Sequence, residues 1–115
     1  MTLAVEGDRV ILQTTDSHGD PIEAYGDEFL STFADQLVRA ARQASNVEAI
    51  DVSFDKPFDE SEVFRVEGVV AWYHIPGVTM LRAGSKEGPA HMTALETLAL
   101  SRYLSRGVKY FSESM

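Results

Sequence analysis

The side chains best suited to acid–base chemistry in this sequence are its 3 histidines. His74 follows Trp72 and Tyr73, and these three residues define a candidate pocket for a small ligand or a reaction. Histidine titrates near neutral pH, so a general base is chemically reasonable at this position. No second residue lies at a sequence spacing from His74 that would complete a catalytic site. We therefore favour a histidine satisfied by one hydrogen bond, and we predict no catalytic residues.

The other histidines do not indicate a metal centre. His18 lies in a turn between Asp16 and Asp20, but the glutamate that a calcium loop needs at its twelfth position is missing. His91 is predicted in the first turn of a helix, and Glu96 stands at the wrong spacing to share a zinc ion with it. The chain has no cysteine, which excludes thiolate sites. We predict no metal and no cofactor.

The loop Gly84–Gly88 precedes a predicted helix start at Pro89, a place where backbone amides can bind anions. The spacing of a phosphate-binding loop is missing, however. Pro89 has no amide proton, and Glu87 repels anions. Neither a GxSxG nucleophile motif nor a cysteine nucleophile is present. An enzyme is therefore the less favoured interpretation.

The formal net charge is −8, and acidic residues dominate the chain before residue 82. This charge disfavours direct binding to nucleic acid, because such binding depends on neutralising phosphates with Lys and Arg. Five acids form a candidate acidic surface: Asp51, Asp55, Asp59, Glu60 and Glu62. They support the hypothesis of an acidic inhibitor or mimic, of the phage or accessory type, that binds a basic nucleic-acid-binding target. Such binding would weaken steeply with salt.

The elements that must position these residues are organised around residues 62–75, the longest run of β-branched and aromatic residues. Alternate positions in this run are apolar: Phe64, Val66, Gly68, Val70 and Trp72. A period of two with one apolar face predicts a strand packed on a core. We expect one central strand with this apolar set lining the interior.

Four further strands are predicted, over residues 2–5, 9–15, 47–54 and 78–83. Glu6-Gly7-Asp8 suits a hairpin turn between the first two, although residues 2–5 could instead be a short lead-in. Pro76-Gly77 predicts a type II turn between the central strand and the last one.

Two amphipathic helices are predicted. The first begins at Gly26 or Asp27 and ends near Ser45, and its apolar residues recur at three- and four-residue steps. The second covers about residues 89–106, and Gly107 is a suitable stop. The apolar residues beyond Gly107 are interpreted as a tail, with a last short strand as one alternative.

This order of elements predicts the fold class. Short connections make the three middle strands an antiparallel meander, and each helix must bury its apolar stripe against a sheet. We predict an α+β two-layer sandwich, with an antiparallel sheet of about four to five strands and two helices on one face. The 115 residues are expected to form a single domain.

The second predicted helix is apolar over more of its circumference than one sheet contact requires. Either the helix is unusually enclosed, or the surplus surface binds another protein. The residues of this candidate interface are Leu100, Tyr103, Leu104, Val108, Tyr110 and Phe111. The favoured hypothesis is a small acidic, non-enzymatic protein-interaction module. It would be homodimeric or bind a partner through this helix or a sheet edge.

Composition also bears on location. The chain has no cysteine, and its first residues lack the basic start and apolar run of a signal peptide. No apolar stretch approaches the ~20 residues of a membrane span. We expect a cytoplasmic protein that does not bind membranes.

Overall fold

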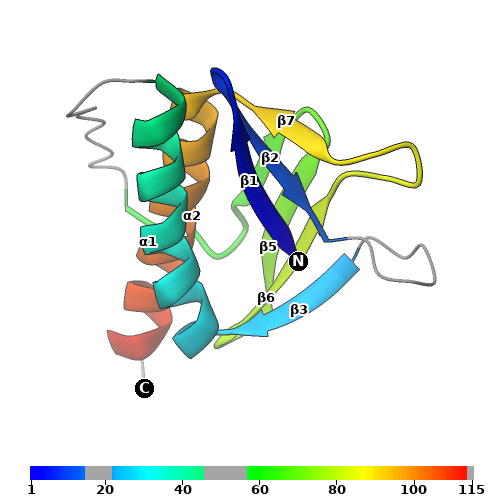
Figure 1. The fold of residues 1–115 in the computed structure, drawn as a ribbon. Helices are drawn as coiled ribbons and strands as arrows, with labels where there is room; N and C mark the ends of the chain where they lie inside the picture. Colours follow the sequence, from blue (N-terminus) through cyan, green and yellow to red (C-terminus); the bar gives the residue numbers. More distant parts are fainter. Residues whose placement is uncertain (15–21, 46–56, 114–115) are drawn as a thin grey trace.

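A computed structural model describes residues 1–14, 22–45 and 57–113 of the chain. Two helices, α1 (Asp27–Ser45) and α2 (Ala94–Glu113), lie side by side and pack on two antiparallel sheets (Figure 1). The hydrophobic core lies between the helices and the sheets. The predicted α+β class is therefore confirmed. The strands divide into two sheets, however, and do not form the single sheet that we expected.

One sheet has three strands, β1 (Thr2–Glu6), β2 (Arg9–Gln13) and β7 (Ala90–Met92), in the order β1-β2-β7. The other has four strands, β3 (Ile22–Gly26), β4 (Val63–Val66), β5 (Val69–Ile75) and β6 (Val78–Ala83), in the order β3-β6-β5-β4. All neighbouring strands are antiparallel. Strands β3 and β7 were not predicted: no element was assigned to the residues of β3, and those of β7 were assigned to the start of the second helix because Pro89 favours a helix start. The predicted strand over 47–54 lies outside the described residues.

The two sheets meet where β2 ends beside β6. Thr14 is fully buried there, its amide donates to the Ala83 carbonyl (3.0 Å), and its hydroxyl accepts from the Ala83 amide (2.9 Å). These bonds satisfy backbone groups that a buried sheet boundary would otherwise leave unpaired. Leu12 of β2 and Leu81 of β6 consequently face the same core.

Helix α1 begins and ends where the sequence predicts. Asp27 and Glu28 in its first turn and Arg42 in its last turn match the helix dipole. Its apolar stripe is buried: Leu30, Phe33, Leu37, Ala40 and Ala44. The Ser101 hydroxyl of α2 donates to the Ala34 carbonyl (2.9 Å), which links the two helices directly.

Helix α2 begins at Ala94, later than predicted. Thr93 and Glu96 form a reciprocal capping box. The Glu96 amide donates to the Thr93 hydroxyl (3.1 Å), and the Thr93 amide donates to the Glu96 carboxylate (2.9 Å). This T-x-x-E signature defines the helix start, whereas Pro89 precedes strand β7.

Helix α2 also continues past Gly107, so both the predicted stop and the alternative of a last strand are wrong. Gly107 is buried, and the ring of Tyr73 occupies the place where a Cβ would project. The Tyr73 hydroxyl donates to the Leu104 carbonyl (2.8 Å). Glycine is needed here because a ring packs directly on the helix backbone, and not because the helix ends.

Residues 62–75 do not form one strand. A tight turn at Glu67-Gly68 joins β4 to β5, with Val66 paired to Val69. Gly68 has a φ of 80°, in the left-handed region that glycine adopts without steric cost. The predicted turn at Pro76-Gly77 is confirmed, since it joins β5 to β6 with a φ of 82° at the glycine.

The turn at Glu67-Gly68 changes which alternate residues face the core. Before it, Phe64 and Val66 pack against the core; after it, Val69 and Ala71 do so and are fully buried. Trp72 therefore points to the other face of the sheet. Its predicted place in the interior is wrong, because a hairpin has reversed the chain within the apolar run.

Candidate interaction surface

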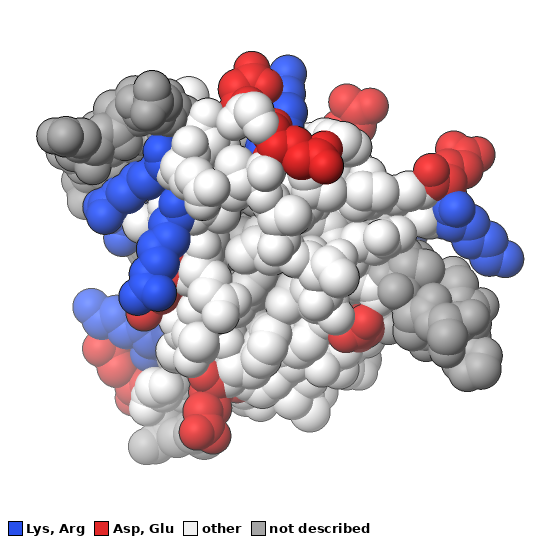
Figure 2. All heavy atoms as spheres, viewed as in Figure 1, with Lys and Arg blue, Asp and Glu red and all other residues white. Residues whose placement is uncertain are grey.

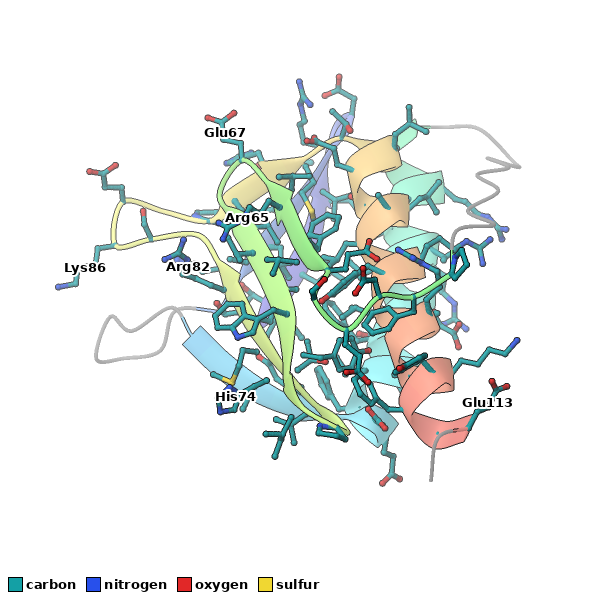
Figure 3. All side chains as sticks on the ribbon, turned by 180° about the vertical axis from the view of Figure 1, so that it is seen from behind. Arg65, Glu67, His74, Arg82, Lys86 and Glu113 are labelled. Carbon is teal, nitrogen blue, oxygen red and sulfur yellow. The ribbon has the colours of Figure 1, made fainter. Side chains whose placement is uncertain are left out.

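The four-stranded sheet has one face on the core and one face that no described helix covers. Figure 3, seen from behind the view of Figure 1, shows Arg65 and Arg82 together on this open side. The outward side chains of β4, β5 and β6 alternate with the inward ones. Six of them form what we call the outer sheet face: Val63, Arg65, Val70, Trp72, Met80 and Arg82.

Strand register arranges the outer sheet face in two rows. In one row, Val70 of β5 pairs with Arg65 of β4 on one side and with Arg82 of β6 on the other. In the next row, Trp72 is flanked by one aliphatic residue from each neighbouring strand. Adjacent strands lie ~4.8 Å apart, so each row spans about 10 Å. One row therefore ends in two cations, and the other is wholly apolar.

The outer sheet face is accessible. Both arginines are exposed, Val63 is 41% exposed, and Trp72 is half-buried. Five of the six residues line an open depression of about 480 Å³: Val63, Arg65, Val70, Trp72 and Arg82. Small-molecule sites usually enclose most of their ligand. An open depression on a sheet is better suited to a protein segment that lies across it.

The charge of this face differs from that of the whole chain. Its outward residues, together with exposed His74, include no acid among the residues described. Neither Arg65 nor Arg82 forms an ion pair with any described residue. Glu67, at the tip of the β4–β5 hairpin, points away from both arginines (Figure 3). On the opposite side, acidic and basic side chains mix around the margins (Figure 2).

The candidate pocket is not assembled in the way the sequence suggested. Consecutive residues of a strand point to opposite faces, so Trp72 lies on the outer sheet face whereas Tyr73 packs beneath α2. His74 is exposed near the end of β5. The sheet therefore separates the side chain of Tyr73 from that of Trp72.

The other positions considered for chemistry also lie apart. His91 is exposed on β7 and does not start a helix, and His18 lies outside the described residues. The loop Gly84–Gly88 is a turn between β6 and β7, closed by paired backbone bonds between Ser85 and Gly88 (2.9 and 3.1 Å). Within residues 1–14, 22–45 and 57–113, no cluster of His, Cys, Asp and Glu could hold a metal ion.

The candidate interface on α2 is turned mainly into the chain's own core. Four of its six residues are buried: Leu100, Tyr103, Leu104 and Phe111. Val108 is half-buried, and Tyr110 is 36% exposed. The structure thus has the enclosed helix that the sequence left open as an alternative. The buried four cannot form a contact surface without opening the core.

Residues 57–62, which we call the strap, lie over three aromatic residues of α2: Tyr103, Tyr110 and Phe111. The ring of Phe58 lies 5.2–5.8 Å, between centroids, from four other rings: Tyr73, Tyr103, Tyr110 and Phe111. Glu62 forms an ion pair with Arg106 of α2 (3.0 Å), and its carbonyl accepts from the Tyr103 hydroxyl (3.0 Å). The surplus apolar surface of α2 is therefore covered from within the chain.

The candidate acidic surface is only partly described, because Asp51 and Asp55 lie outside the described residues. The other three acids, Asp59, Glu60 and Glu62, form contacts within the strap or between the strap and α2. Glu62 pairs with an arginine of α2, and Glu60 accepts from a tyrosine hydroxyl of α2 (2.8 Å). Asp59 accepts from the amide and the hydroxyl of the residue two positions later (2.9 and 2.8 Å). These contacts help to hold the strap against α2.

One buried and two partly buried tyrosines predict sensitivity to alkali. Burial raises the pKa of Tyr73 to about 12, and it also raises the pKa of Tyr25 and of Tyr103. The unfolded chain releases these protons near pH 10, whereas the folded chain retains them. Stability is thus fully present below about pH 10 and decreases as the pH rises towards 12. We expect the urea midpoint to fall across this window, and the phenolate absorbance of these three tyrosines to appear together with unfolding.

The Tyr73→Phe variant is the control for this prediction. It should lose about 1 kcal/mol at neutral pH, because the hydrogen bond to the Leu104 carbonyl is removed. Its decline above pH 10 should be shallower, since one ionising group is gone. A wild-type midpoint that stays constant between pH 10 and 12 would contradict the prediction.

Sequence reasoning missed most of the outer sheet face. The sequence pattern was available, because Arg82 alternates with buried apolar residues of its strand and Arg65 alternates with partly buried ones. This pattern could be interpreted only with the hairpin at Glu67-Gly68 in place, because that turn puts Arg65 and Trp72 on the same face of the sheet.

Comparisons of the chain with family models, curated proteins and solved structures gave no match. In the part of the chain that the structure describes, no helix combines the length and the apolar character needed to cross a membrane.

Proposed function

We propose that this protein is a non-enzymatic protein-binding domain whose contact surface is the outer sheet face. The observation that carries the proposal is the position of Trp72, half-buried in the middle strands of an uncovered sheet face. Apolar side chains held in water on an open sheet are stabilised when a partner buries them. Trp and Arg are also the residues that most often dominate the binding free energy of protein interfaces.

The shape of the site supports a protein partner over a small substrate. The depression is open, and its chemistry comes from aliphatic side chains, one indole and two guanidinium groups. None of these groups is a nucleophile or a general base at neutral pH. Binding through such a surface needs only shape and charge complementarity.

The proposal places the contact surface on the sheet and away from α2. Tyr110 is the one exposed member of the sequence-predicted interface, and its hydroxyl is already bonded to Glu60. A second copy of the chain is the less favoured partner, because this face carries two arginines and no acid among the described residues, so two such faces in contact would bring like charges together. A different protein is the favoured partner.

Trp72→Thr is expected to weaken partner binding strongly and to leave the fold intact. Threonine is well accommodated in strands, and the indole lies outside the main core. Loss of a dominant interface residue costs ~2 kcal/mol or more, so affinity should fall by roughly 30-fold or more. The measurement is quantitative affinity capture from the source cells, followed by titration of the captured protein with wild type and variant.

Leu95→Ser is the matched control for that experiment. Leu95 is 62% exposed on α2, so the control removes an exposed apolar side chain from another surface. It should retain the partner. A partner that binds Trp72→Thr as tightly as wild type would contradict the proposal. Sedimentation that shows a Trp72-dependent dimer would assign the face to a second copy instead.

A further inference from the structure

We infer that the outer sheet face binds an acidic protein segment that presents two carboxylates, about 10 Å apart, on either side of an apolar side chain. Arg65 and Arg82 would bind the carboxylates, and Val70 and Trp72 would receive the apolar side chain. The inference rests on the proposed function, and it adds the chemistry of the partner.

The spacing follows from the strand register. Arg65 and Arg82 occupy the same row of the sheet, with Val70 as the direct cross-strand neighbour of both. Two strand spacings separate the backbones of the arginines, which gives the distance of about 10 Å. Because the three residues belong to hydrogen-bonded neighbouring strands, the sheet fixes the spacing of their backbones before any partner arrives. A segment with matching carboxylates would therefore need no rearrangement of the backbone.

The charges point to the same class of partner. Both arginines are exposed, and neither pairs with a described acid, although the chain carries 18 Asp and Glu residues. A guanidinium group can bind a carboxylate through two parallel hydrogen bonds, a geometry that it also offers to phosphate. Two carboxylates would satisfy both arginines at once.

The net charge of −8 does not prevent this contact. At physiological ionic strength, charges separated by more than about 8 Å are largely screened, whereas contacting pairs are not. No acid of the described residues occupies an outward position of β4, β5 or β6, so none lies between the two arginines. The two arginines then determine which charged groups of a partner can make direct contact with this face.

The apolar row favours a protein segment over single-stranded nucleic acid. Val63 and Met80 flank Trp72, and aliphatic side chains match the side chains of a peptide better than the edges of bases. Nucleic-acid binding also depends on neutralising many phosphates, and this face offers two arginines on an acidic molecule.

The test is a selection of peptides from a random library displayed on phage, with the full-length chain immobilised. Wild type should enrich peptides in which Asp or Glu residues flank an aliphatic or aromatic residue. The double variant Arg65→Glu/Arg82→Glu should lose those peptides by at least tenfold in recovery and enrich basic ones instead. Arg39→Glu/Arg102→Glu, which reverses two exposed arginines on the helices, is the matched control and should select the same peptides as wild type.

The outcomes separate the inference from the proposed function. If wild type selects peptides that depend on Trp72 but show no acidic enrichment, the inference fails and the proposed function stands. If no selected peptide depends on Trp72, both fail. If labelled oligothymidine binds with a loss in Arg65→Glu/Arg82→Glu while no acidic peptide does, the face belongs to nucleic acid and the inference is overturned. Thermal unfolding of each variant checks that the fold is retained.

Discussion

Replacing Gly107 with alanine is expected to destabilise the protein, although alanine is the better helix former. The added Cβ would overlap the ring of Tyr73, far inside van der Waals contact. The displaced tyrosine would lose its hydrogen bond to the Leu104 carbonyl, worth about 1 kcal/mol, and contacts with three rings, worth roughly 0.5–1.5 kcal/mol each. Alanine gains about 1 kcal/mol in helix propensity over glycine, which leaves a net loss of about 1.5–4.5 kcal/mol. Urea unfolding followed by circular dichroism measures this loss.

A double-mutant cycle shows whether the contact with Tyr73 is the cause. In a Tyr73→Ala background the obstacle is gone, so Gly107→Ala should become stabilising by up to about 1 kcal/mol. Ser105→Ala, at an exposed position of the same helix, should change stability by less than about 0.5 kcal/mol. If Gly107→Ala has the same sign in both backgrounds, Tyr73 is not the reason for the glycine.

Phe58→Ala is expected to lower stability by about 3 kcal/mol and to expose the aromatic residues of α2 that the strap covers. Truncation of a core phenylalanine costs about 3–5 kcal/mol, and Phe58 falls at the lower end because it is half-buried. Its ring contacts four others, so no other single truncation in the strap removes as much apolar contact. Urea unfolding measures the loss, and an increase in the fluorescence of anilinonaphthalene sulfonate reports the exposed surface.

Phe29→Ala is the control for the strap. It makes the same truncation at a ring that is 42% exposed and has two ring neighbours, and it should cost less than half as much. The fluorescence of Trp72 should stay unchanged in Phe58→Ala, because the indole lies on the opposite face of the sheet from the strap and α2. Equal losses in the two variants would show that the strap has no special part in covering α2.

The two helices show which helix boundaries can be predicted from residues close together in the sequence. The stripe of α1 and its charged ends are properties of consecutive residues, and the helix lies where they predict. The start of α2 was also encoded locally, in Thr93 and Glu96, but Pro89 offered a competing signal. Gly107 was misjudged because its reason lies in Tyr73, a residue distant in sequence.

The candidate sites show the same division. A run of apolar residues on α2 looks identical in sequence whether a partner or the chain's own strap covers it. Phe58 decides between these outcomes, and its contact with α2 joins residues about fifty positions apart. Likewise, the single turn at Glu67-Gly68 decides whether Trp72 faces the core or solvent, because side chains alternate along a strand.

By itself, the sequence determined the features that depend on short-range periodicity and charge: an α+β fold, an amphipathic first helix, the turn at Pro76-Gly77 and an acidic molecule. Only the tertiary structure decided that the strands divide into two sheets, that the strap encloses α2, and that Arg65, Trp72 and Arg82 share one open face. The physical reason is that exposure is a property of what packs on a residue. For this chain, that depends on contacts between segments far apart in the sequence.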